Sequence, residues 1–379
     1  MTGKAQGFLV ACTLVFFTGC NTGDGTCGDG ILQRSRGETC EPELLLEATC
    51  ETLGYYPGTL ACSDDCGYSY VGCGGFCGDG RVQADFGEVC DAGDLAGQTC
   101  VSLGFNGGTL ACNADCTTLD ASGCELLAMI EIPAGTFQRD DDPANLSTVS
   151  AFLMSRTEIT RWQYRLMTGH DPTDETSSSG PGDPVRDVTW SDAAVFCNLL
   201  SRHEGLTPVY PSGGGAIGAN LMANGYRLPT EMEWRWAAMG ADLDDPGEVN
   251  TTGWSRAFAG DDGTLALGDY AVFGYGTGEP GATRYDSSEP ACSRLPNELE
   301  LCDLSGNVME WTQDWFAPIP PGPLTDYVST DLITVEFAVT GGSWRSPAER
   351  CTLAYRRGID PNLTGITSSS IGFRVVRRP

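Results

Sequence analysis

Basic side chains and histidine are scarce in this sequence of 379 residues. It contains one lysine, Lys4, and two histidines, His170 and His203, and its formal net charge at pH 7 is −29. Binding to nucleic acid requires clustered lysine and arginine, so we expect no nucleic-acid partner. Two histidines are too few for a three-histidine zinc site or for a histidine-rich iron site.

Long apolar runs are also scarce, and only the N-terminus carries one. Residues Gly7 to Gly19 are uncharged and mostly apolar, and they follow the positive charge of Lys4. A membrane-spanning helix needs about 20 such residues, so this shorter run is typical of a secretory signal peptide. No other run approaches about 18 apolar residues, and we expect no further membrane-spanning segment.

The apolar run ends in a short motif, in which residues 17–19 (Phe-Thr-Gly) directly precede Cys20. Small residues before a cysteine resemble the bacterial lipoprotein signal, in which that cysteine is lipidated and becomes the new N-terminus. We expect residues 1–19 to be removed and residues 20–26 to form the anchor and a short linker. The protein would then be exported and held on a bacterial membrane, in the periplasm or at the cell surface. A plain secretory signal is the alternative.

Cysteine, in contrast, is abundant, and most of the 18 cysteines belong to a tandem repeat. The repeat covers residues 27–73 and 77–124, with six cysteines in each segment. The first five recur at an offset of 50 residues and the sixth at 51, and the neighbouring residues recur with them. The cysteines of the repeat are Cys27, Cys40, Cys50, Cys62, Cys66, Cys73, Cys77, Cys90, Cys100, Cys112, Cys116 and Cys124.

An even number of cysteines in so short a segment predicts a disulfide framework. Each segment is too small to fold on apolar contacts alone, and one bridge adds about 2–4 kcal/mol. The short spacing of Cys62 and Cys66 leaves zinc as the alternative, although neither segment contains histidine. The segments resemble the cysteine-rich repeats that precede many exported myxobacterial proteins. Their Gly-Asp-Gly turns would allow adhesion or calcium binding, whereas a stalk for the main domain is the simpler function.

The remainder of the chain is predicted to form one large α+β domain with much loop. Residues 129–137 alternate like a strand that ends in a turn. Thr160 could cap a short helix, and a second helix is expected to start at Ser191. The clearest signal is Thr230 with a glutamate three residues later, a capping box that predicts a helix to about Met239.

Six short motifs follow one another along residues 126–379. They are residues 157–160 (Thr-Glu-Ile-Thr), 188–193 (Val-Thr-Trp-Ser-Asp-Ala), 226–231 (Tyr-Arg-Leu-Pro-Thr-Glu), 306–311 (Gly-Asn-Val-Met-Glu-Trp), 341–344 (Gly-Gly-Ser-Trp) and 372–374 (Gly-Phe-Arg). In this order and spacing they resemble the formylglycine-generating enzyme family, also called sulfatase-modifying factor domains. The resemblance implies a C-type-lectin-like α+β fold with little regular secondary structure.

The resemblance also implies copper chemistry. Family enzymes use O₂ and a Cu(I) ion, held by two cysteines five residues apart, to oxidise a sulfatase cysteine to formylglycine. Here the second position is Cys351, but the first is Ser346. Cu(I) is soft and prefers thiolate ligands, so the copper site is expected to be incomplete. Ser343 matches a family serine near the reacting groups, and a turn hydroxyl is its alternative role.

The large domain contains four cysteines, Cys197, Cys292, Cys302 and Cys351. An even count in an exported domain predicts two disulfides, so we expect Cys351 to be bridged and unable to bind copper. Val375 occupies the position of the family's usual partner for Cys197.

Calcium is the second cofactor that the resemblance implies. Its ligands would be the side chains of Asp303 and Glu310 and the backbone carbonyls of Gly306 and Val308. Two carboxylates with carbonyls and water give the hard oxygen shell that calcium prefers. The alternative is that Asp303 and Glu310 are ordinary turn and capping groups.

Two functions follow from these patterns. The first is an exported lipoprotein whose domain resembles enzymes that make formylglycine in a protein or peptide substrate, but with an incomplete copper site. The second is a non-catalytic, calcium-stabilised lectin-like module that binds or presents a surface ligand. Ser346 in place of a cysteine favours the second function, whereas the six motifs support the enzyme family.

Overall fold

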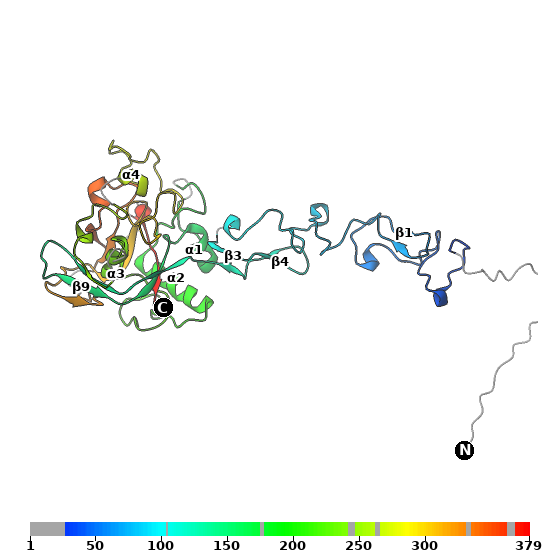
Figure 1. Cartoon of the computed structure of the whole chain (residues 1–379), viewed down its shortest axis with the longest axis horizontal. Coiled ribbons are helices and arrows are strands. Elements are labelled where there is room, and N and C mark those ends of the chain that lie inside the picture. The colour runs from blue at the N-terminus through cyan, green and yellow to red at the C-terminus, as the bar shows by residue number, and fades with distance from the viewer. Residues whose placement is uncertain are drawn as a thin grey trace, which may run out of the picture. The chain divides into compact units, whose positions relative to one another are not determined.

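The structure is a computed structural model that describes most of the chain (Figure 1). The expected signal peptide and the linker that begins at Cys20 lie outside the described residues. The chain divides into two compact units. The first comprises the chain up to Gly97 with Leu110–Asp120, and the second comprises Gln98–Thr109 with Ala121–Pro379. The described residues are 27–103, 105–174, 178–241, 247–261, 266–330, 335–361 and 368–379.

Disulfides organise the two cysteine-rich segments. Both use the same pairing, in which the first cysteine joins the fifth, the second joins the fourth and the third joins the sixth. The bridges are Cys27–Cys66, Cys40–Cys62, Cys50–Cys73, Cys77–Cys116, Cys90–Cys112 and Cys100–Cys124. Cys62 and Cys66 belong to different bridges, so the zinc interpretation of their spacing is wrong. So many disulfides indicate an oxidising compartment and an exported protein.

Regular structure in these segments is limited to single turns and very short strands. The antiparallel pairs are β1 (Ala61–Cys62) with β2 (Tyr68–Ser69), β3 (Gly107–Gly108) with β6 (Cys124–Glu125), and β4 (Ala111–Cys112) with β5 (Leu119–Asp120). The 3-10 helices are η1 (Arg34–Arg36), η2 (Glu51–Leu53), η3 (Ala84–Phe86) and η4 (Val101–Leu103). Because such elements bury little surface, the disulfides supply most of the constraint.

An acidic side chain closes each Gly-Asp-Gly turn. The carboxylate of Glu41 accepts the backbone N–H groups of Gly28 and Gly30, at 3.0 and 3.2 Å. Asp91 plays the same part in the second segment, where it accepts two glycine N–H groups at 2.6 and 2.7 Å. These turns therefore have a structural role that requires no bound ion.

Beyond residue 126, the strands of the second unit form three sheets. They are β17-β10-β7, β11-β8-β9-β13 and β15-β14-β12-β16. The strands are β7 (Met129–Ile132), β8 (Gly135–Gln138), β9 (Leu146–Val149), β10 (Phe152–Ser155), β11 (Val249–Asn250), β12 (Met309–Trp315), β13 (Leu324–Thr325), β14 (Phe337–Thr340), β15 (Arg356–Ile359), β16 (Ile371–Gly372) and β17 (Val376–Arg377). β12 lies at the centre of its sheet, antiparallel to β14 and parallel to β16.

Three helices of the second unit begin with a capping box, at Thr160, Thr189 and Thr230. The helices are α1 (Arg161–Thr168), α2 (Trp190–His203), α3 (Glu231–Ala238) and α4 (Leu267–Tyr270), with 3-10 turns at η6 (Gly253–Ser255), η7 (Ala348–Arg350) and η8 (Ser368–Ser370). Within the described part of the chain, no helix has both the length and the apolar character to cross a bilayer.

Two local predictions need correction. The second helix starts at Trp190 and not at Ser191, because the side chain of Thr189 accepts the backbone N–H of Asp192 and caps it. Residues 129–137 contribute to two strands, since the chain turns at Pro133 between β7 and β8.

Apolar packing in the second unit forms two large clusters and one small one. The first includes Trp190 and Cys197 of α2, and the second includes Trp234 and Trp236 of α3. The small cluster contains Cys351 with two buried residues from the loop after α4.

Candidate functional site

The two serines predicted for copper chemistry form a closed turn after β14. Ser346 donates its backbone N–H to the carbonyl of Ser343 at 2.8 Å. The Oγ of Ser346 accepts the backbone N–H of Ser343 at 3.0 Å, and the two hydroxyls lie 3.2 Å apart. Both side chains are buried. The Ser346 hydroxyl therefore stabilises the turn, which explains a serine at this position without any metal.

Cys351 lies directly beside this turn. A Cβ added at Gly342, where φ is +74°, would lie 2.8 Å from the Cys351 Sγ, so the backbone approaches the thiol closely. Ala271 and Phe273 pack over the sulfur, and the residue is fully buried. Burial raises the pKa of the Cys351 thiol to about 12, which keeps it protonated at neutral pH.

The expectation of two disulfides in the large domain is wrong. Cys292 and Cys302 form one bridge, whereas Cys197 and Cys351 are free thiols. Cys197 is buried in the cluster around α2, and Cys351 lies in the separate small cluster. Neither thiol therefore has a free cysteine partner within its own cluster.

Glu310, predicted as a calcium ligand, is bound by an arginine. Nε and Nη2 of Arg374 donate to the two oxygens of Glu310, each at 2.7 Å. The indole N–H of Trp234 donates to Oε2 at 2.9 Å. Arg374 uses its remaining N–H groups on three backbone carbonyls, so all five donors of this buried side chain are satisfied. One lone pair on Oε1 of Glu310 remains available by this count.

Two further acids surround this ion pair. Glu158 is fully buried, and it accepts the backbone N–H of Val308 at 3.2 Å and the side-chain amide of Asn307 at 3.1 Å. Oδ2 of Asp303 accepts the backbone N–H of Cys292 at 2.6 Å. Oδ1 of Asp303 is buried and has no hydrogen-bond partner among the described residues.

The charge balance of this group suits a cation. Three buried carboxyl groups, those of Glu158, Asp303 and Glu310, share one guanidinium. Burial raises the pKa of Glu158 well above its usual value and that of Asp303 to about 6. Such acids must keep a proton or gain a positive ion, and the unpartnered oxygen of Asp303 offers a ligand position. Hard oxygen donors are the ligands that calcium prefers.

Sequence reasoning assigned no role to Glu158 or Arg374. Both lie inside motifs of the family resemblance, at residues 157–160 and 372–374. Arg374 is also flanked by apolar Phe373 and Val375, and a charged residue in such a setting signals a buried ion pair.

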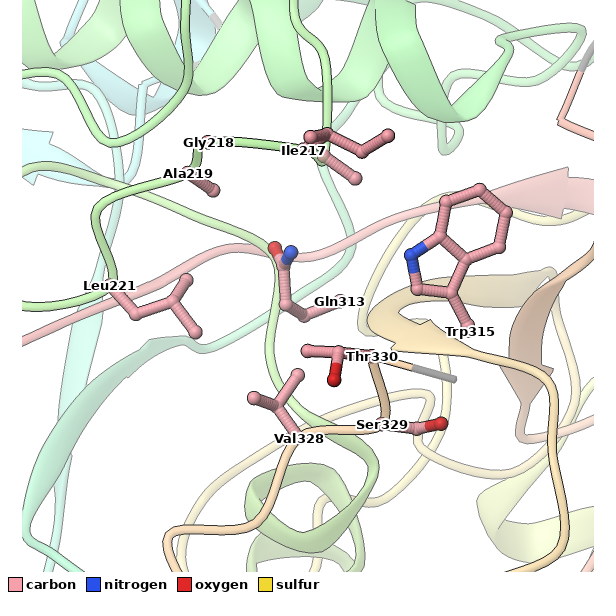
Figure 2. A pocket seen from close by; sticks show the side chains of 10 residues that line it. Ile217, Gly218, Ala219, Leu221, Gln313, Trp315, Val328, Ser329 and Thr330 are labelled. Carbon is pink, nitrogen blue, oxygen red and sulfur yellow. The ribbon is translucent and has the colours of Figure 1, made fainter. Parts of the chain in front are cut away.

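A pocket of about 340 Å³ lies at the other end of β12 (Figure 2). Gln313 and Trp315 line one side, because alternate residues of a strand project to the same face. The segment from Ala216 to Leu221 lines the opposite side, and residues 328–330 complete it.

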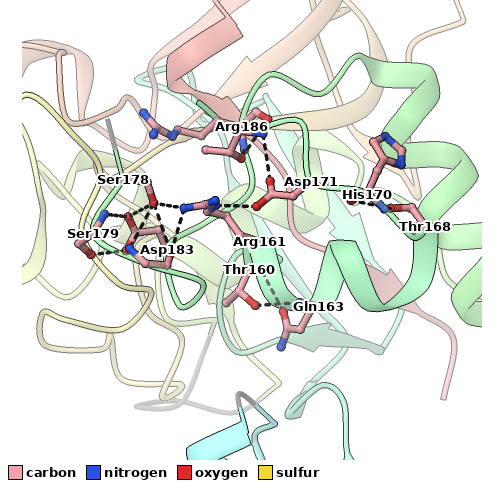
Figure 3. A network of polar contacts seen from close by, with 12 residues as sticks. Thr160, Arg161, Gln163, Thr168, His170, Asp171, Ser178, Ser179, Asp183 and Arg186 are labelled. Carbon is pink, nitrogen blue, oxygen red and sulfur yellow. Dashed lines mark hydrogen bonds and ion pairs between the residues drawn. The ribbon is translucent and has the colours of Figure 1, made fainter. Parts of the chain in front are cut away.

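Figure 3 shows a polar network that follows the start of α1. Arg161 donates to Asp171 at 2.8 Å and to Ser178 at 2.7 Å, and Asp183 accepts hydrogen bonds from two serines. His170 is exposed, and its ring makes an edge-to-face contact with Tyr164, with the ring centroids 5.7 Å apart. This is its one aromatic contact among the described residues. The network fastens a loop to α1, and it gives the histidine no catalytic setting.

These observations define a mixed α+β domain with little regular secondary structure, in an exported, disulfide-rich chain. Its buried thiol, Cys351, stands where the family resemblance expects a copper ligand. The model for the sulfatase-modifying factor enzyme 1-like domain matches residues 118–379, and the chain belongs to this family. The predicted fold, a mixed α+β domain with little regular secondary structure, is confirmed.

Similar proteins fall into more than one functional group. The chaperone protein LppX of Paenibacillus barcinonensis is 28% identical over 254 residues, which cover 61% of this chain and 81% of LppX. The formylglycine-generating enzyme of Mycobacterium tuberculosis is 29% identical over 309 residues, covering 67% of this chain and 99% of the enzyme. Among solved structures, Treponema denticola variable protein 1 is 27% identical, with a TM-score of 0.54 over 67% of this chain and 95% of its own.

Proposed function

We propose that the domain is a polypeptide-binding module of the cell exterior that does not oxidise its ligand. The observation that carries this proposal is the state of Cys351, a lone, fully buried thiol whose pKa burial raises to about 12. Oxidation by the family's copper chemistry needs a pair of thiolates, and the first of the two positions is Ser346 and not a cysteine. The serine hydroxyl is a hard, protonated ligand, and it is already engaged with Ser343.

A polypeptide ligand is supported by the relatives. One is named a chaperone and others are named formylglycine-generating enzymes, which act on a cysteine within a protein chain. Proteins with either name recognise a polypeptide. We therefore expect polypeptide binding to remain in a domain that lacks the oxidation chemistry. The same names would equally suit an enzyme, and the serine at position 346 is our reason for proposing a binding module instead.

Selection from a random peptide library tests this function. The full chain and its Cys351→Ser variant are each used as bait, because a binding module does not need the thiol. We expect both baits to enrich the same sequences. Failure of both to enrich any sequence, or enrichment of cysteine-containing peptides by the parent chain alone, would contradict the proposal.

Calcium is proposed as a stabilising ion and not as a reactant. Asp303 and Glu310 would hold it, with the carbonyls of Gly306 and Val308 and with Glu158 nearby. We expect added Ca²⁺ to raise the melting temperature of the full chain. Asp303→Asn, which keeps an acceptor for Cys292 but removes the charge, should abolish this rise. Glu300→Gln, at an exposed acid, should preserve it.

A lipid anchor at Cys20 is proposed from the sequence motif. Metabolic labelling with palmitate in a bacterial host tests it directly. Label should enter the parent chain and not the Cys20→Ser variant, and equal labelling of both would remove the anchor from the proposal.

A further inference from the structure

We propose that the pocket at the end of β12 binds an uncharged, apolar side chain of an extended polypeptide, with Gln313 and Trp315 as hydrogen-bond donors to its backbone. This inference rests on the proposed function and names its binding site. The pocket is separate from the copper position, because Cys351 packs in another cluster, with Ala271 and Phe273.

The walls of the pocket select against charge. None of the described residues that line it is ionisable, and most are apolar. A charged group placed there would lose its hydration without gaining a partner, whereas an aliphatic or aromatic side chain would gain free energy from burial.

Hydrogen bonding fixes the direction of the Gln313 amide. The hydroxyl of Tyr210 accepts the backbone N–H of Leu228 at 2.9 Å. Its single proton is then donated to Oε1 of Gln313, at 2.6 Å. The NH₂ group of Gln313 is consequently the free end, and Figure 2 shows the amide directed into the pocket. These donors lie at the pocket wall, where they can pair with an acceptor from a ligand or from water.

The indole of Trp315 is held by aromatic stacking. Its ring centroid lies 4.2 Å from that of Phe337, which in turn stacks on Trp190 at 4.3 Å. Figure 2 shows the N–H edge of Trp315 turned toward Gln313 across the pocket. Two donors from one strand therefore face a shared space, which suits the carbonyl oxygen of a peptide bond.

The surroundings favour a polypeptide over a small molecule. Leu221 also lines a neighbouring, polar pocket that contains Arg227, Glu233 and Arg378. Ile217 lines the first pocket and Met222 lines the second, and they are 76% and 73% exposed, so a ligand that spans both pockets would cover them. An extended chain can place one apolar side chain in the first pocket and continue across the exposed residues to the polar one.

Nuclear magnetic resonance of the full chain with labelled tryptophan tests the proposal. The probe is the uncharged peptide acetyl-Gly-Gly-Leu-Gly-Gly-amide, and its analogue with aspartate in place of leucine is the comparison. The Trp315 indole signal is assigned by its loss in Trp315→Phe. We expect the leucine peptide to shift this signal, and the aspartate peptide to bind at least about tenfold more weakly.

Two substitutions locate the binding site. Ile217→Asp changes an exposed residue at the pocket, and Gln313→Glu keeps the acceptor for Tyr210 but removes the donors. Each should weaken leucine-peptide binding about tenfold or more, whereas Val249→Asp, at an exposed residue of β11 that does not line the pocket, should have no effect. Melting curves of each variant confirm that it is folded.

The possible failures are distinguishable. If the library yields binding peptides but none shifts the Trp315 signal, or if Ile217→Asp binds them like the parent chain, the pocket assignment is overturned and the proposed function survives. If the library yields no peptide, the proposed function itself fails. A shift produced by the disaccharide chitobiose and not by the peptide would overturn the polypeptide assignment.

Discussion

Cys351 lies beneath Ala271 and Phe273, where its thiol keeps its proton at neutral pH. A reactive free cysteine needs the thiolate and access to solvent, and this buried, protonated residue lacks both. The even number of cysteines in the large domain predicted a disulfide at Cys351. An even number, however, says nothing about how far apart two cysteines lie in the fold. Only the packing reveals that the two thiols lie in separate clusters.

Alkylation measures the state of this thiol. At about pH 8 we expect iodoacetamide to leave Cys351 unmodified in the native chain, because thiolate is scarce and the sulfur is buried. After unfolding in guanidinium, without reductant, Cys351 and Cys197 should both react, and peptide mapping separates the two. Rapid, stoichiometric labelling of native Cys351 would contradict the account.

Arg374 is the second residue on which the domain depends. It is the guanidinium that faces Glu310, and removing one partner leaves a buried charge without compensation. We expect Arg374→Met to lower the free energy of unfolding by about 3–5 kcal/mol in urea titrations. Arg345→Ala removes an exposed pair with Asp286 and should cost at most about 1 kcal/mol. Similar effects of the two substitutions would contradict the assignment.

Among the secondary-structure elements, α2 has two candidate capping residues, Thr189 and Ser191. Thr189 caps the helix in the structure, whereas the sequence pattern placed the start at Ser191. We expect Thr189→Ala to lower the free energy of unfolding by about 1 kcal/mol. Ser191→Ala, at an exposed position inside the helix, should be neutral or slightly stabilising because alanine is the better helix former. The reverse order in denaturant titrations would restore Ser191 as the cap.

Local elements could be predicted and long-range ones could not. Capping boxes at Thr160 and Thr230 are encoded within four residues, so their helices were predictable. The pairing of β12 with β16 joins segments far apart in the chain, and no local pattern specifies it. Asp303 and Glu310 were recognised from one loop, whereas Glu158 and Arg374 reach the same cluster from distant segments. The Gln313 pocket has no sequence signal, since three separate segments build it.

For the whole molecule, buried acids govern the dependence of stability on pH. Burial, assisted by the charge of Glu231, raises the pKa of Asp314 to about 8. The folded state therefore keeps a proton that the unfolded state loses at about pH 4, and stability falls as pH rises from about 4 to 8. We expect a loss of up to about 1.4 kcal/mol per pH unit from this group.

Comparison with Asp314→Asn isolates that contribution. The variant cannot titrate at this position, so its unfolding free energy should fall less steeply between about pH 5 and 7. Its absolute stability should also be lower, because Asp314 accepts backbone N–H groups from both Glu231 and Ser329. Identical slopes for the two proteins, measured in urea at several pH values, would contradict the assignment.

The bridged and free cysteines of the described residues reflect the compartment in which the protein folds. The described residues pair their cysteines in seven disulfides and leave two buried thiols, neither of which has the neighbour that copper requires. An oxidising environment thus stabilises this protein through its disulfides, while the two thiols stay reduced and buried.

Aldehyde formation distinguishes a binding module from an enzyme that oxidises cysteine. A sulfatase peptide with its target cysteine is incubated with the full chain, Cu(I), reductant and O₂, and formylglycine is detected with an aldehyde-reactive hydroxylamine and mass spectrometry. For a binding module we expect no aldehyde beyond the amount formed with copper alone. Conversion by the parent chain that disappears in Cys351→Ser would contradict this expectation.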